Sequence, residues 1–256
     1  MDADFKNRFI RLWDDYFPGA ELPMGFYYAD RDCGIEKKKK TGNHSCLIAD
    51  LSAVRRGKAL CFNKESIGCV GGVRCCGFPC DQRPDFEYFL SCGIPGKVEG
   101  IRYKKTPQLV KETQNRHPPF SAPKSTIVFK RWDSFEEMDN PDAIIFFAAA
   151  DVLAGLFSLA NFDEGDPQSV IAPSCAGCAS VVQYPYLESQ QPVPKSVMGM
   201  FDISARPYLR ADLLTFTVPW SKFQRMVNHM EESFLITDAW IRIQKRLKKR
   251  LTGDTT

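Results

Sequence analysis

The stretch AIIFFAAADVLAGLFSLA, residues 143–160, decides the fold class. Its first six residues are apolar and include two isoleucines and two phenylalanines, which is typical of a buried strand. Apolar residues then recur at helical spacing after Asp151, which favours a helix. Asp151 and Gly155 interrupt the apolar run, so it lacks the length of a membrane-spanning helix. The stretch therefore predicts a strand followed by a helix.

Comparable patterns occur on both sides of this stretch. Further strands are predicted at residues 24–29, 125–130, 169–172, 197–201 and 214–218, and further helices at 5–16, 47–54, 85–92, 106–115, 175–184, 223–230 and 237–251. Strands and helices mixed with long connections predict an α+β fold with a mixed β-sheet flanked by helices. No segment is rich enough in Pro, Gly or Ser to prove a boundary, so we expect a single domain over residues 1–256, with at most a weak subdivision near 115–124.

Charge and composition exclude several classes of partner. The 256 residues carry 34 Lys and Arg against 31 Asp and Glu, a net charge of +3, which is too small to indicate nucleic acid or a membrane surface as partner. The first residues, MDADFKNRF, do not resemble a signal peptide, so we expect a soluble, cytoplasmic protein. Thiols stay reduced there, and the 10 cysteines are therefore expected to be metal ligands, redox thiols or packing residues.

A Gly- and Cys-rich segment lies in the first half of the chain. The sequence CFNKESIGCVGGVRCCGFPCDQRP, residues 61–84, holds five cysteines and four glycines. It has no helical period and is not polar enough for a linker, so we expect a loop wrapped around a site. Its cysteine spacings match neither a zinc ribbon nor a ferredoxin run.

A second cysteine motif, Cys175-Ala-Gly-Cys178, follows a predicted strand and begins a predicted helix. Thiols at the start of a helix face unpaired N–H groups, which stabilise the thiolate. Both a redox pair and half of a metal site suit this arrangement. The chain has only 3 histidines, far apart in the sequence, and soft thiolate ligands without histidine favour iron–sulfur over catalytic zinc.

Six strings carry a resemblance to a known family: ELPMGFYYAD, ALCFNKESIGCVGG, FEYFLSCGIPG, NFDEGDPQSVIAP, CASVVQYPYLES and GMFDISARPY. Together they are similar to the uncharacterised ArCR family of archaea and anaerobic bacteria. The resemblance implies one integrated domain and brings no activity with it. The cysteines inside the resembling strings are Cys61, Cys69, Cys92 and Cys178. On this basis we expect these four thiolates to ligate an iron–sulfur cluster of the 4Fe–4S type, with zinc as the alternative metal.

One basic residue is a candidate for ligand binding. Arg206, in the string FDISARPY, could clamp a carboxylate or phosphate, and the competing interpretation pairs it with Asp202 or Glu188.

Three functions therefore stay open. The first is an iron–sulfur protein with redox or sulfur chemistry and an electron-transfer partner. The second is a non-enzymatic protein that binds a small anion or a metal near Arg206, and the third is a thiol-redox protein that uses Cys175 and Cys178. Whether the protein is an enzyme is left open.

Overall fold

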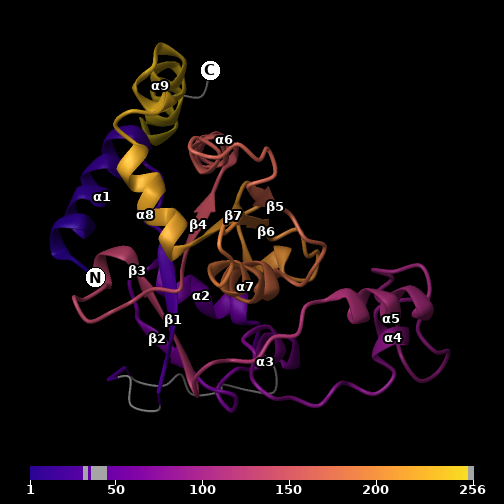
Figure 1. Cartoon of the computed structure of the whole chain (residues 1–256). Coiled ribbons are helices and arrows are strands. Elements are labelled where there is room, and N and C mark those ends of the chain that lie inside the picture. The colour runs from indigo at the N-terminus through magenta and orange to yellow at the C-terminus, as the bar shows by residue number, and fades with distance from the viewer. Residues whose placement is uncertain (31–33, 36–44, 253–256) are drawn as a thin grey trace. The chain divides into compact units, whose positions relative to one another are not determined.

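A seven-stranded sheet forms the centre of the computed structural model, which describes residues 1–30, 34–35 and 45–252 (Figure 1). The strands lie in the order β2-β3-β1-β4-β7-β6-β5. Their bounds are β1 Met24–Ala29, β2 Leu60–Phe62, β3 Thr126–Arg131, β4 Ala143–Ala148, β5 Val170–Ile171, β6 Ser196–Gly199 and β7 Leu214–Pro219. Neighbouring strands pair antiparallel except β5 and β6, which are parallel. The predicted α+β fold with a mixed sheet is confirmed.

Helices cover both faces of this sheet. The helices of the described residues are α1 Ala3–Tyr16, α2 Leu47–Arg55, α3 Val70–Cys75, α4 Phe86–Phe89, α5 Pro107–Arg116, α6 Ala150–Ala160, α7 Tyr184–Ser189, α8 Trp220–His229 and α9 Asp238–Thr252. A π-helical segment, η2 (Ala179–Gln183), runs directly into α7. Within the described residues, none of these helices combines the length and the apolar character needed to cross a membrane.

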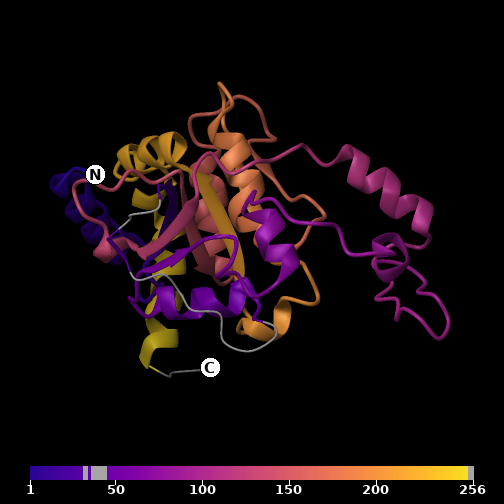
Figure 2. The same cartoon turned by 90° about the horizontal axis from the view of Figure 1, so that it is seen from below.

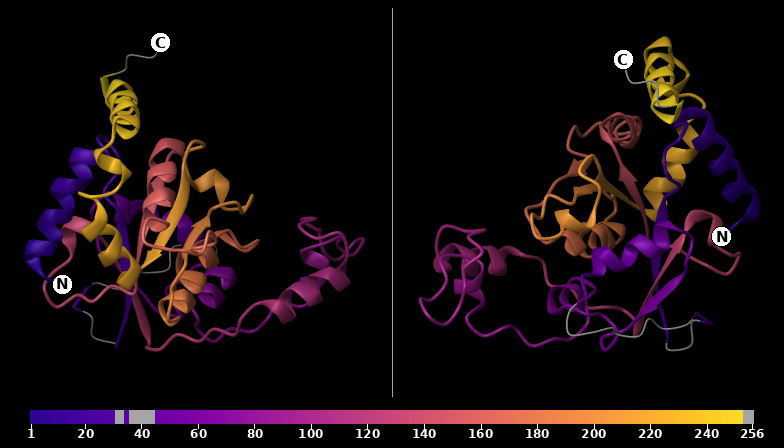
Figure 3. Two further views of the ribbon diagram at one scale, coloured as in Figure 1. Left: turned by 45° about the horizontal axis from the view of Figure 1, so that its top comes forward. Right: turned by 180° about the vertical axis from the view of Figure 1, so that it is seen from behind.

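Large apolar side chains fill one face of the sheet, which we call the aromatic face. Helices α1, α6, α8 and α9 pack there against β4 and β7, as Figure 1 and Figure 3 show for α1 and α8. Phe9 of α1 lies 4.8 Å from Trp132 and 5.1 Å from Phe223 of α8, measured between ring centroids. Rings in such edge-on contacts add stability beyond the area they bury. This face is the main hydrophobic core.

The opposite face, which we call the thiol face, is covered by α2, α3, η2 and α7 (Figure 2). The Arg55 guanidinium of α2 lies 4.6 Å above the Phe147 ring of β4, and Tyr28 of β1 contacts Tyr186 of α7 at 5.2 Å between centroids. η2 lies very close to β6, because a Cβ added to Gly199 would be 2.0 Å from the Ser180 hydroxyl oxygen. Glycine therefore permits this approach of helix to strand.

Local structure differs from the sequence expectations at three places. The segment at residues 61–84 is not all loop, because it contains the end of β2 and the short helix α3. Serine is a preferred N-cap residue, so Ser45 is the cap expected for the helix predicted at 47–54; the cap position of α2 is instead Cys46, and the Ser45 hydroxyl donates to Asp50. The helix expected at 175–184 begins at Gly177 and is π-helical over η2. Helical periodicity fails as a signal where glycines and cysteines replace the usual apolar stripe.

The chain divides into two compact units, residues 1–78 with 122–256 and residues 79–121. The second boundary lies within residues 115–124. The smaller unit contains α4 and α5, which are joined by an ion pair of 3.1 Å between Lys111 and Glu87. In the same unit the Arg83 guanidinium lies 4.1 Å above the Phe89 ring. The sheet and both of its helical layers belong to the larger unit.

Candidate functional site

Six cysteine side chains gather on the thiol face of the larger unit. They come from three segments of the chain: Cys46 before α2, Cys69, Cys75 and Cys76 at α3, and Cys175 and Cys178 before η2. Cys178 interacts electrostatically with each of the other five thiols, which makes it the centre of the group. All the described cysteines are free thiols. We call these six residues the thiol cluster.

Cys75 and Cys178 form the most intimate pair in this cluster. Their thiols share a hydrogen bond, and the two residues expose only 6% and 9% of their surface. That hydrogen bond, together with burial, raises the pKa of Cys178 well above the ordinary value of a thiol. The Cys178 thiol therefore holds its proton beside Cys75.

The thiol of Cys69 is held differently. Cys69 is half-buried, and its sulfur accepts a hydrogen bond of 3.2 Å from the backbone N–H of Gly72. Burial raises the pKa of Cys69, while hydrogen bonds from the backbone N–H groups of Leu47 and Gly72 lower it. These N–H groups oppose the effect of burial in part, and the pKa of Cys69 stays above the ordinary value of a thiol.

Cys175 is the other cysteine of the CxxC motif. Every cause that acts on its thiol raises its pKa. Burial, together with the neighbouring Cys178 and the charge of Asp202, raises the pKa of Cys175 to about 12. The Asp202 carboxylate accepts a hydrogen bond of 2.9 Å from the backbone N–H of Gly177, between the two cysteines. Cys175 is thus a protonated thiol at neutral pH.

Tyrosines and one buried carboxyl border the cluster. The Tyr28 hydroxyl donates to the carbonyl oxygen of Cys76 at 2.9 Å, and burial raises the pKa of Tyr184, near Cys175 and Cys75, to about 12. Burial also raises the pKa of Asp142 to about 6. Its carboxylate accepts the backbone N–H of Tyr28 at 3.0 Å. The two tyrosines are therefore neutral neighbours of the thiols, and Asp142 adjoins Tyr28.

The four cysteines expected to bind a cluster lie in different places. Cys69 and Cys178 are both in the thiol cluster. Cys61 pairs with Val128, which pairs with Tyr27, so its side chain points to the face opposite Tyr28. Cys92 belongs to the smaller unit and is exposed. Among the residues that the structure describes, no group of three or more histidine, cysteine, aspartate or glutamate side chains is arranged to hold a metal ion.

Arg206 is engaged by its own loop. Its guanidinium donates to the carbonyl oxygens of Leu213 and Ala211, the latter at 2.7 Å. Both acceptors follow Arg206 in the loop that leads to β7. These bonds use two of the five N–H donors of the guanidinium, and an anion at Arg206 stays a prediction.

Sequence reasoning missed Cys46, Cys75 and Cys76 as members of the site. Cys75 and Cys178 are 103 positions apart in the chain, and nothing in their spacing connects them. The only usable signal was the density of cysteines in residues 61–84, which indicated a site without indicating its partners.

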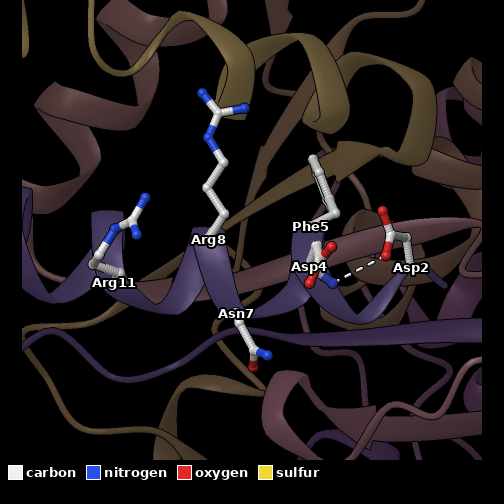
Figure 4. Close-up of a pocket in the computed structure, with 6 residues that line it drawn as sticks. All are labelled: Asp2, Asp4, Phe5, Asn7, Arg8 and Arg11. Carbon is white, nitrogen blue, oxygen red and sulfur yellow. Dashed lines mark hydrogen bonds between the residues drawn. The ribbon is translucent and has the colours of Figure 1, made fainter.

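A pocket of about 570 Å³ lies along α1, away from the thiols (Figure 4). It is lined by Asp2, Asp4, Phe5, Asn7, Arg8 and Arg11. Asp2 caps α1 by accepting the N–H of Asp4, and Arg8 pairs with Glu231 at 2.9 Å. Its lining comes from a single helix and has no nucleophile, so we place the candidate site at the thiol cluster.

Comparisons with known proteins give a family and no activity. The family model described as uncharacterised ArCR matches residues 20–229, most of the chain. The matched range contains the whole thiol cluster and leaves out the α1 pocket. Neither the curated proteins nor the solved structures include a match to this chain.

Proposed function

The chain belongs to the uncharacterised ArCR family, and because this membership assigns no activity, we propose from the site alone that it is a thiol-redox protein. Its reactive group is the dithiol of Cys75 and Cys178. The observation that carries the proposal is the hydrogen bond between these two buried thiols. The proposal includes a cytoplasmic location, where glutathione and thioredoxin keep such a pair reduced.

The reaction is a thiol–disulfide exchange. Two protein thiols lose two protons and two electrons as the bond between the sulfurs of Cys75 and Cys178 forms. A disulfide of the class of glutathione disulfide accepts those electrons and leaves as two thiols. The position of Cys75 as the hydrogen-bonding neighbour of Cys178 supports this step, since a disulfide needs its two cysteines side by side. The electron-transfer partner is accordingly a disulfide or a dithiol.

The test is oxidation of the full chain followed by mapping of the linkage. Reduced protein is equilibrated with glutathione disulfide, free thiols are alkylated, and disulfide-linked peptides are identified by mass spectrometry. We expect a linkage between Cys75 and Cys178 that dithiothreitol reverses. A folded protein that forms no such linkage at equilibrium would overturn the proposal.

Cys76 offers a matched control. It adjoins Cys75, is fully buried, and interacts with Cys178 only through its charge. Cys75→Ser should abolish the linkage, whereas Cys76→Ser should retain it. Equal retention in both variants would place the redox pair elsewhere.

A cysteine-ligated iron–sulfur cluster is a second candidate function, favoured by the gathering of six thiols around Cys178. Cys69 and Cys178 would be ligands from the expected set, and neighbouring thiols of the cluster would complete it. Zinc is the alternative metal. Anaerobic purification with iron, sulfide and zinc analysis separates these functions: brown protein with iron and sulfide supports the cluster, and metal-free protein at full thiol content excludes both metals.

A further inference from the structure

We propose that Asp202 is a positioning residue that selects the disulfide partner of Cys178. By holding the turn at the start of η2, it favours Cys75 over Cys175 as that partner. This inference rests on the proposed redox function and deepens it, because it adds how one of two possible disulfides is chosen. It is carried by the hydrogen bond from the turn to Asp202 and by the packing of the chain around that bond.

Cys178 has two candidate partners. Cys175 lies three positions before it in the CxxC motif, and Cys75 of α3 is its hydrogen-bonding neighbour. Either pairing passes two protons and two electrons to the same external disulfide, so the products differ only in which sulfur bonds to Cys178. A flexible turn would bring the two cysteines of the motif together readily, because the loop between them is short. Selection of Cys75 therefore requires a turn that is held in place.

Asp202 holds this turn through its backbone. The Oδ2 atom of Asp202 accepts the N–H of Gly177 at 2.9 Å, and Gly177 lies between the two cysteines of the motif. Gly177 is the first residue of the helix, whereas Cys175 lies outside it. A glycine at this position would otherwise let the chain rotate freely. The bond to Asp202 therefore fixes the peptide group that must turn for Cys175 to approach Cys178.

The carboxylate of Asp202 is itself held in position. Its other oxygen, Oδ1, accepts the N–H of Ser204 at 3.0 Å and the Ser204 hydroxyl at 2.7 Å. The carbonyl oxygen of Asp202 accepts the N–H groups of Ala205 and Arg206, each at 3.1 Å. Such local bonds from side chain to backbone fix a turn of the chain. The carboxylate is therefore aimed at Gly177 by its own loop.

The turn also packs against the chain that follows β6. The Ser180 hydroxyl donates to the carbonyl oxygen of Gly177 at 2.7 Å and accepts the N–H of Met200 at 3.3 Å. A Cβ added to Gly177 would lie 3.0 Å from both the Met200 sulfur and the Cβ of Ala205. Met200 is buried and has a φ of 68°, which a non-glycine residue rarely adopts. The chain is thus bent onto the turn directly after β6.

The charge of Asp202 provides a second signature of its position. Burial, the neighbouring Cys178 and the Asp202 charge together raise the pKa of Cys175. Removal of the charge should therefore make the Cys175 thiol reactive at lower pH. A residue that acted only on the stability of the fold would not move this pH profile.

The test is disulfide mapping of the full chain after equilibration with glutathione disulfide. We expect the Cys75–Cys178 linkage in the wild type. Asp202→Ala removes the acceptor, so the ratio of the Cys175–Cys178 linkage to the Cys75–Cys178 linkage should rise about tenfold, as the loss of one hydrogen bond to a charged group predicts. Asp202→Asn retains an oxygen that accepts the Gly177 N–H and should keep a ratio close to that of the wild type.

Asp212→Ala is the matched control, because Asp212 lies in the same loop and pairs with Arg210 at 2.7 Å. It should keep the wild-type ratio. Circular dichroism checks that each variant is folded. Should Asp202→Ala fail to fold, Ser204→Ala removes a hydroxyl that orients the carboxylate and should raise the ratio by a smaller factor. Alkylation of Cys175 by iodoacetamide, followed by peptide mapping, should shift to lower pH in both Asp202 variants.

Three results would overturn the selection and leave the redox pair intact. The first is a wild-type linkage ratio in folded Asp202→Ala or, in its place, Ser204→Ala. The second is a ratio in Asp202→Asn as high as in Asp202→Ala, which would assign the effect to the charge instead of the hydrogen bond. The third is an alkylation profile of Cys175 that does not move. Absence of the Cys75–Cys178 linkage in the wild type would instead overturn the proposed function itself.

Discussion

The aromatic face and the thiol face lie on the same sheet, and the thiol cluster gathers on only one of them. Behind the aromatic face, rings such as Phe9, Trp132 and Phe223 contact one another edge to face. The thiol face also has buried rings, such as Phe26, Phe62 and Phe129, but cysteines gather beside them and the segment η2 is π-helical. π-helical turns are frequent at functional sites.

This difference indicates that the stability of the fold and the chemistry of the thiols depend on different side chains. Large rings bury much apolar area per residue and hold the layers together. Cysteine is small, so the cluster contributes less packing energy and leaves its sulfurs free to change partner. We therefore expect substitutions on the two faces to affect different measurements.

The largest expected effect is on the aromatic face. Phe9→Ala removes a ring that is 1% exposed and contacts four aromatic neighbours. The free energy of unfolding should fall by about 3–5 kcal/mol in urea titrations. The folded variant should still form the Cys75–Cys178 disulfide at the wild-type rate. A changed rate at unchanged secondary structure would contradict the separation of the faces.

The next effect concerns pH on the thiol face. Burial raises the pKa of Asp142 from 3.8 to about 6, so in the folded protein the carboxyl holds its proton at pH values where the unfolded chain has lost it. Its contribution to stability is fully present below pH 4 and disappears as pH rises through about 6. Relative to Asp142→Asn, the wild type should lose up to about 3 kcal/mol between pH 4 and pH 7.

Unfolding free energies measured at both pH values check this expectation. The asparagine retains an oxygen that accepts the N–H of Tyr28. This hydrogen bond is therefore present in both proteins and does not affect the comparison. The value of about 6 already includes the opposing effect of the nearby Lys124 charge. Parallel pH curves for the wild type and Asp142→Asn would show that this carboxyl does not set the pH dependence.

Gly199→Ala should lower the free energy of unfolding by an intermediate amount and should also change the rate of disulfide formation. The added methyl group would be 2.0 Å from the Ser180 oxygen and 2.9 Å from that of Thr215, so η2 must move. Overpacking of this kind costs about 1–3 kcal/mol. Displacement of η2 should also slow disulfide formation between Cys75 and Cys178.

Gly71→Ala is the control, because a Cβ there meets no atom within 4 Å. It should leave both the unfolding free energy and the disulfide rate close to the wild-type values. If Gly199→Ala behaved like Gly71→Ala, the close approach of η2 to β6 would not matter for the site.

The smallest effect is expected at Cys61, the fully buried cysteine of β2 on the aromatic side of the sheet. Cys61→Ala should cost about 1 kcal/mol, the loss of one buried sulfur. Oxidation of the thiol cluster should not change, as measured by peptide mapping. Loss of a metal or of the disulfide in this variant would instead return Cys61 to the site.

Much of the fold followed from local patterns. The strand and helix at residues 143–160 and the strand at 24–29 lie where the sequence predicts them, because their apolar periods match the buried positions. Helix α3 escaped prediction, since Val70-Gly-Gly-Val-Arg-Cys75 offers no apolar stripe. It forms because tertiary contacts and the Cys69 cap support a segment of low helix propensity.

The sequence by itself determined the element order, the α+β class and the fact that cysteines mark the region of interest. Only the tertiary structure decided which cysteines meet. Side-chain alternation along β2 directs Cys61 away from the cluster, and the packing of η2 against α3 brings Cys178 to Cys75. A contact across 103 positions depends on how helices stack on a sheet, and no local spacing encodes it.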